Sequence, residues 1–148
     1  MKKFSFVIGL ALALALGLAF VSCDNGTTGG GGGIRKSGPG ANLIDRLEYR
    51  DYTRLYIWFK GGVRFDGGYL NRDIDIFVNG EDVGVVGGYS YDGNTLLLSV
   101  GTIPNKPYII GQSYTIKVVY TASSNAKLYS GGTLVGSFTI EQTVVYRW

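Results

Sequence analysis

The chain has 148 residues, 45% of them hydrophobic, which suffices for one folded domain with a core of ordinary size. It contains no histidine and a single cysteine, so it lacks the commonest general base and metal ligand and cannot form an internal disulfide. The formal charge is only +3 and the basic residues are scattered, so we expect no nucleic-acid partner.

The N-terminus has the order of a secretory signal. Lys2 and Lys3 give a positive start, Phe6 to Val21 is an unbroken apolar stretch, and the small residue Ser22 precedes Cys23. A cysteine at this point makes the segment resemble the signal of bacterial lipoproteins. The resemblance implies a signal peptide over residues 1–22 and acylation of Cys23, with membrane lipid as the partner. An uncleaved N-terminal membrane helix is the alternative.

The lipoprotein resemblance implies an exported domain anchored in the cell envelope. Asp24 resembles an inner-membrane retention signal of some two-membrane bacteria, but that rule does not transfer between bacterial groups, so both membranes stay open. Loss of Lys2 and Lys3 with the signal peptide would lower the formal charge from +3 to +1. Lipid, rather than electrostatic attraction, would therefore hold the protein in place.

The segment that follows the cysteine is rich in glycine, serine, threonine and asparagine. It runs from Asp24 to about Asn42 and includes five consecutive glycines at Gly29–Gly33. Such a stretch buries too little apolar area to offset its ordering entropy. We therefore expect a flexible tether over residues 23–42 and a folded domain over residues 43–148.

The first part of the expected domain alternates in polarity. Residues 42–50 are compatible with a short helix or an opening strand. Thr53 to Lys60 then predicts a strand, with Leu55, Ile57 and Phe59 on one face and Tyr56, Trp58 and Lys60 on the other. A shift of parity by one residue would exchange the two faces.

The middle of the chain predicts three more strands. Asp73 to Asn79 places Ile74, Ile76 and Val78 inward, and Asn79-Gly80 is a tight-turn signal with Val83 to Tyr91 as the return strand. Asp92-Gly93 marks the next turn. Thr95 to Val100 follows, with Leu96, Leu98 and Val100 on one face.

The last third begins with a loop, Gly101 to Gly111, which contains Pro104 and Pro107. Ser113 to Ala122 alternates again, and Ser123-Ser124-Asn125 predicts a turn. Leu134 to about Trp148 is expected as the final strand. A bulge is predicted near Gln142, because a polar residue there occupies an apolar position of the alternation.

About seven short strands without intervening helices predict an antiparallel two-sheet sandwich. Thr53 to Ala122 also resembles the bacterial Ig-like repeats of cell-surface and S-layer proteins, through the motifs TRLYIWFKGGV, DIDIFVNGEDV, YDGNTLLLSVG and IIGQSYTIKVVYTA. The resemblance implies an all-β, Ig-like sandwich. It brings no binding residue with it, because the motifs are turns and core positions.

Two sets of side chains are candidate sites. Tyr56 and Trp58 share the outward face of their strand and would contact a sugar ring or a protein partner, unless they serve packing. Asp73 and Asp75 are candidate calcium ligands, with solvated strand charges as the alternative. No acid–base pair suited to catalysis is visible, so we expect neither an enzyme nor a cofactor.

The expected function is that of a membrane-anchored lipoprotein of the cell envelope with a non-catalytic interaction or structural module, adhesive in character. Its partner would be a protein or a glycan. The alternative is a carbohydrate-binding β-sandwich that uses its exposed aromatic residues.

Overall fold

The computed structural model describes residues 33–50, 53–102 and 107–147. The predicted signal peptide, Cys23 and the first part of the predicted tether lie outside the described residues. Within the described ranges, no helix is long and apolar enough to cross a membrane.

The described residues form three antiparallel sheets. Sheet A has the order β1 (Arg35–Ser37), β12 (Phe138–Val145), β9 (Ser113–Tyr120), β5 (Ile74–Val78) and β6 (Glu81–Asp82). Sheet B has the order β2 (Ile44–Arg50), β3 (Arg54–Phe59), β8 (Thr95–Val100) and β7 (Val85–Asp92). Sheet C has the order β11 (Thr133–Leu134), β10 (Ala126–Ser130) and β4 (Val63–Gly67). Two single turns of 3₁₀-helix, η1 (Ala41–Leu43) and η2 (Leu70–Arg72), complete the secondary structure described.

The prediction of an all-β domain built from antiparallel strands is confirmed, but the strand number is not. The described residues contain twelve strands where about seven were expected. The additional strands are β1, β4, β6, β10 and β11, all of five residues or fewer. Strands this short contain too few alternating positions for the period of two to stand out in the sequence.

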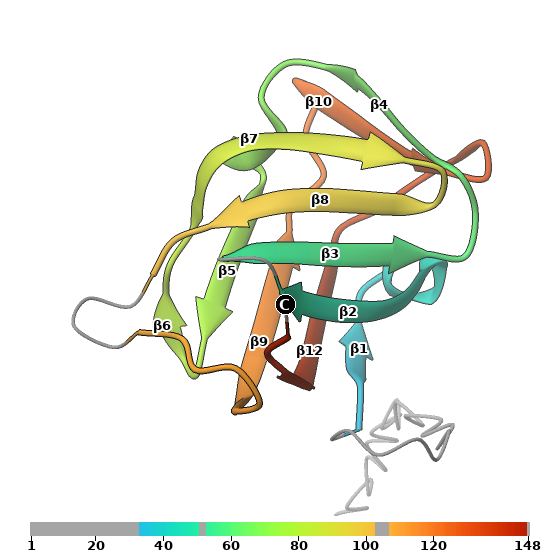
Figure 1. Ribbon diagram of the computed structural model, residues 1–148. Coiled ribbons are helices and arrows are strands. Elements are labelled where there is room, and N and C mark those ends of the chain that lie inside the picture. Colours follow the sequence, from blue (N-terminus) through green and yellow to red (C-terminus); the bar gives the residue numbers. More distant parts are fainter. Residues whose placement is uncertain (1–32, 51–52, 103–106, 148) are drawn as a thin grey trace, which may run out of the picture.

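The two larger sheets cross at a steep angle. Figure 1 shows the strands of sheet B running across the view, with β5, β9 and β12 of sheet A running up and down behind them. Sheet C lies at the upper right of the same view. A steep crossing is an orthogonal packing, whereas the sheets of an immunoglobulin fold cross at about 30°.

The core lies between sheets A and B, where the predicted alternation places it. On β3, Leu55, Ile57 and Phe59 are fully buried, while Tyr56 and Trp58 are only half-buried on the opposite face. The same pattern holds for the predicted inward residues of β5, β8 and β9. Burial of one face per strand explains why both sheets remain packed together.

The predicted return strand after Asn79-Gly80 is wrong in its pairing. The turn itself forms, with φ values of 51° and 85° at these two residues. Only β6 pairs back onto β5, however, and β7 pairs with β8 in the other sheet. Gly84 follows with a φ of 56°, a conformation that favours glycine. Because the chain turns there, the next strand leaves sheet A and joins sheet B.

The predicted tether extends too far along the chain. Arg35–Ser37 pairs with β12 in sheet A, and Ala41 is only 3% exposed within the core. The domain therefore includes residues 35–42, which the composition assigned to the tether. The composition of β1, polar residues next to glycines, is that of a flexible linker. Only its pairing with β12 shows that this segment is an edge strand of the domain. Residues 44–50, ambiguous in the sequence, form the strand β2.

The predicted final strand is also corrected. The segment from Leu134 onward divides into the end of β11, a connection over 135–137, and β12. Strand β12 pairs with β9 over eight consecutive positions without a register shift, so there is no bulge at Gln142. The polar residue keeps its inward position because its side chain has a hydrogen-bonding partner on another sheet.

Candidate functional site

Tyr56 and Trp58 lie on the outer face of sheet B, next to one another on β3. Trp58 pairs with Arg46 on β2 and Thr95 on β8, and Tyr56 is opposite Glu48 and Leu97. Both aromatic side chains are half-buried. Their neighbours across the strands therefore decide how much of each ring is accessible.

Arginine side chains from β2 cover these two rings. The guanidinium carbon of Arg46 lies 4.4 Å from the centroid of the Trp58 ring, and that of Arg50 lies 4.2 Å from the Tyr56 ring. Both distances are those of a cation–π contact. Glu48 lies between the two arginines, at 3.0 Å from Arg46 Nε and 3.7 Å from Arg50. The rings are thus part of a packed surface layer of alternating cations and aromatic groups.

The layer also contains polar atoms without hydrogen bonds. The indole nitrogen of Trp58 and Nε of Arg50 are both buried, and neither has a hydrogen-bonding partner among the described residues. The two rings therefore contribute to packing, and the surface they form is less open than a bare aromatic platform for stacking sugars.

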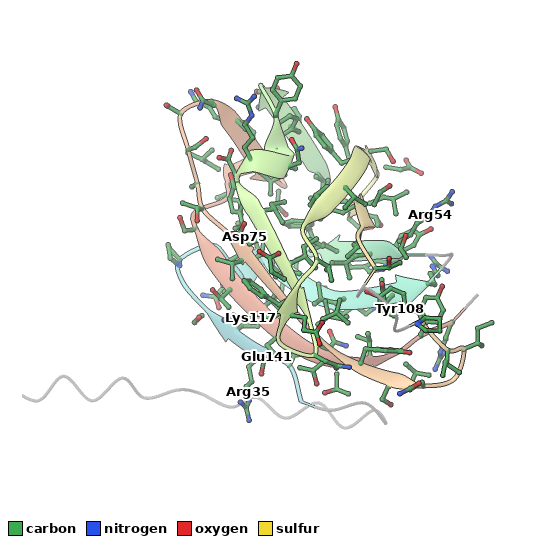
Figure 2. The ribbon with its side chains drawn as sticks, turned by 90° about the vertical axis from the view of Figure 1, so that its left-hand side faces the viewer. Arg35, Arg54, Asp75, Tyr108, Lys117 and Glu141 are labelled. Carbon is green, nitrogen blue, oxygen red and sulfur yellow. The ribbon has the colours of Figure 1, made fainter. Side chains whose placement is uncertain are left out.

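Positive charge gathers at one end of this face. Arg50 on β2 pairs directly with Arg54 on β3, and Arg50 also forms a parallel bridge with Arg147 near the C-terminus. We call Arg50, Arg54 and Arg147 the arginine row. Within the described ranges, Arg54 and Arg147 take part in no salt bridge. Figure 2 shows Arg54 projecting from the edge of the domain into solvent.

The candidate calcium ligands Asp73 and Asp75 have separate surroundings. The Asp73 carboxylate accepts a hydrogen bond of 2.8 Å from the Ser123 hydroxyl, which ties the turn at residue 123 to the start of β5. Asp75 is exposed on the outer side of β5. In the part of the chain that the structure describes, no group of three or more His, Cys, Asp or Glu side chains is arranged to hold a metal ion.

Four tyrosines, Tyr49, Tyr108, Tyr114 and Tyr146, form a second aromatic cluster, but this one is internal. The centroids of the Tyr49 and Tyr108 rings are 5.0 Å apart in an edge-to-face arrangement. The Tyr114 hydroxyl accepts a hydrogen bond of 2.8 Å from the Ile109 N–H, and the Tyr108 hydroxyl donates one of 3.0 Å to the Gly101 carbonyl. The cluster thereby fixes the segment at residues 107–111. Burial first, and the adjacent Tyr108 second, raise the pKa of Tyr49 far above its ordinary value.

None of three comparisons with known proteins, made against family models, curated proteins and solved structures, finds a match to this chain. The Ig-like relationship and the lipoprotein assignment therefore rest on the sequence motifs alone.

The arginines of the outer face were not singled out from the sequence. A signal for two of them exists, because Arg46, Glu48 and Arg50 alternate with the buried residues Leu47 and Tyr49 along β2. Once β2 is assigned as a strand, this alternation predicts that the charged residues share the outer face. Nothing local places Arg147 beside them, since that contact joins residues almost a hundred positions apart.

Proposed function

We propose that the protein is an exported lipoprotein of a bacterial cell envelope, anchored through an acylated Cys23, whose β domain is a non-catalytic binding or structural module. The basic start, the apolar stretch and the Ser22-Cys23 pair support the anchor. The described domain starts at Gly33, ten residues after the cysteine. A stretch of this length spans at most about 35 Å. The domain would thus stand close to the membrane that carries it.

The observation that carries the binding role is the outer face of sheet B. Its aromatic rings, arginines and single glutamate form an ordered, partly exposed layer on a rigid sheet, which is the kind of surface that presents fixed side chains to a partner. The partner is a protein or a glycan. An Ig-like relationship of the domain belongs to this proposal on the strength of the motifs between Thr53 and Ala122 alone, because sheets A and B cross more steeply than the sheets of an immunoglobulin fold.

Carbohydrate binding is the second candidate function for the same face. It is favoured by one arrangement: Tyr56 and Trp58 lie two residues apart on β3, both half-exposed on the side away from the core. Sugar rings would then contact the parts of these aromatic groups that the arginines leave open.

Metabolic labelling with palmitate tests the anchor. The full chain is expected to incorporate label and to remain in the membrane fraction. Cys23→Ala is expected to lose the label, and Asp24→Asn serves as the control that keeps it. Persistent label in Cys23→Ala would contradict the anchor.

A glycan array and cross-linking in isolated envelopes test the binding role. We expect the mature chain carrying Cys23→Ala to bind a partner through the outer face of sheet B. Trp58→Ala and Arg50→Gln should weaken that binding while the protein stays folded. Binding that survives both changes would assign the role to another surface.

A further inference from the structure

We propose that the arginine row, Arg50, Arg54 and Arg147, is a binding site for the carboxylate or sulfate groups of an anionic polysaccharide. The inference rests on the proposed binding role of the domain, and it names the ligand class and the residues that would recognise it.

The first support is the placement of three like charges on adjacent strands. Arg54 and Arg147 both flank Arg50 in the backbone pairing, one on β3 and the other near the C-terminus. Like charges directly opposite one another in a sheet are destabilising. A bound anion would convert this repulsion into attraction, because each guanidinium can form a two-pronged hydrogen bond to an oxyanion.

The second support is that Arg50 is held in place with spare donor capacity. Its guanidinium rests over the Tyr56 ring at 4.2 Å, and its nearest carboxylate, on Glu48, is 3.7 Å away. Its Nε is buried and therefore not accessible to a ligand, so the terminal guanidinium nitrogens are the donors that could reach an anion. Glu48 also serves Arg46, at 3.0 Å from Nε. One shared carboxylate therefore faces the row from β2. Asp51, the residue after Arg50, lies outside the described ranges.

The third support concerns the character of the surface. The large apolar side chains that are exposed in the described ranges are Tyr69, Val86, Tyr91, Ile109, Ile110 and Leu134. Val86 and Tyr91 lie on β7, at the edge of sheet B farthest from β2, and none of the six lies on β2, β3 or β8. A protein partner of ordinary affinity requires an apolar centre in the contact area, whereas a charged polymer is held by a row of fixed cations. The part of the surface formed by β2, β3 and Arg147 therefore suits an anionic polysaccharide better than a protein.

The test compares two arginines that differ in their surroundings. Arg54→Gln removes one member of the row. Arg64→Gln is the control, because Arg64 is exposed on a strand as Arg54 is. Its guanidinium lies 4.3 Å from the Tyr129 ring, as that of Arg50 lies over Tyr56. Arg64 already has a carboxylate partner, Asp66, at 2.8 Å. Both variants lose one positive charge. They are made in the mature chain with Cys23→Ala.

Binding is measured to polygalacturonate, a sulfated polysaccharide, neutral dextran and vesicles of anionic phospholipid, at two salt concentrations. We expect the chain to bind the two anionic polysaccharides, with affinity falling as salt rises. Arg54→Gln should raise Kd about fivefold, the size of one exposed ion pair, and Arg64→Gln should leave it nearly unchanged. Arg54→Gln should also leave the melting temperature unchanged or higher, since it relieves repulsion.

Four outcomes would overturn the inference. The first is an equal loss of affinity in both variants, which would mean attraction by net charge alone. The second is the absence of polyanion binding by the folded chain, and the third is binding to the vesicles only. Binding to dextran that depends on Trp58 but not on Arg54 would also overturn it, yet would leave the proposed binding role intact. Whether Cys23 is acylated is tested independently, by the palmitate-labelling experiment.

Discussion

The side-chain oxygen of Gln142 on β12 accepts a hydrogen bond of 2.8 Å from the backbone N–H of Leu47 on β2. The contact joins an inner position of sheet A to the edge strand of sheet B, where Leu47 is only 2% exposed. A buried N–H without an acceptor is costly, so the polar side chain is required at a position that is otherwise apolar. A further bond of 3.2 Å, from Arg147 N–H to the Tyr49 carbonyl, continues this seam between the two sheets.

Gln142→Met tests the seam, because methionine has a similar size and only a weak acceptor. It leaves the Leu47 N–H without its oxygen partner and should lower the free energy of unfolding by about 1–3 kcal/mol. Urea denaturation measures the change. Gln142→Glu is the control, since it keeps an oxygen acceptor and should cost less than Gln142→Met. Equal stability of Gln142→Met and the parent chain would show that the hydrogen bond contributes nothing.

Gly40→Ala tests the start of the domain. A Cβ at Gly40 would collide with the carbonyl oxygen of Gly136, although the backbone at Gly40 has an ordinary φ of −83°. Overpacking of this kind costs about 1–3 kcal/mol. Gly33→Ala is the control, because a Cβ there would have nothing within 4 Å. If residues up to 42 instead formed a tether, neither Gly40→Ala nor Gly33→Ala would change the melting temperature.

Arg46 and Trp58 should be coupled in stability. The guanidinium lies 4.4 Å from the ring centroid, and an exposed cation–π pair contributes about 0.5–1 kcal/mol. A double-mutant cycle of Arg46→Ala and Trp58→Ala, followed by chemical denaturation, measures this coupling. The control cycle combines Trp58→Ala with Arg64→Ala on sheet C and should be additive. Additivity in the first cycle as well would contradict the contact.

Tyr49 should make the domain sensitive to alkali. Burial raises its pKa in the folded state, whereas an unfolded tyrosine ionises near pH 10. The resulting stability is fully present below about pH 10 and is lost as the pH rises above it, because only the unfolded chain then releases the proton. Tyr49→Phe has no ionisable hydroxyl and so removes this pH-dependent contribution to stability. Its free energy of unfolding, measured from pH 8 to pH 11, should therefore fall less steeply than that of the parent chain. Parallel curves would refute the assignment.

The outward position of Tyr56 and Trp58 and the inward position of Leu55, Ile57 and Phe59 were predictable from alternation along β3. The same holds for the tight turn at Asn79-Gly80, whose residues tolerate positive φ. These features are local, since each depends on a period of two or on the conformational range of one or two residues. The calcium hypothesis at Asp73 and Asp75 had the same local basis and stays a prediction, while the hydrogen bond from the Ser123 hydroxyl to Asp73 is a long-range contact that the sequence did not indicate.

The pairing of β7 with β8, the role of β1 and the function of Gln142 were not predictable in this way. Each depends on which distant segment lies alongside, and a period of two says nothing about the partner. The arginine row is the clearest case, because its three members come from β2, from β3 and from a residue beyond β12.

The amino-acid sequence by itself determined that this protein is an all-β domain and which positions of its longer strands are buried. Only the tertiary structure decided where the domain starts, how sheets A and B are joined by Gln142, and where positive charge accumulates. The physical reason is the difference in range. Side-chain alternation and turn conformation are encoded over a few neighbouring residues, whereas strand pairing brings together side chains up to about a hundred positions apart and creates surfaces that no single segment contains.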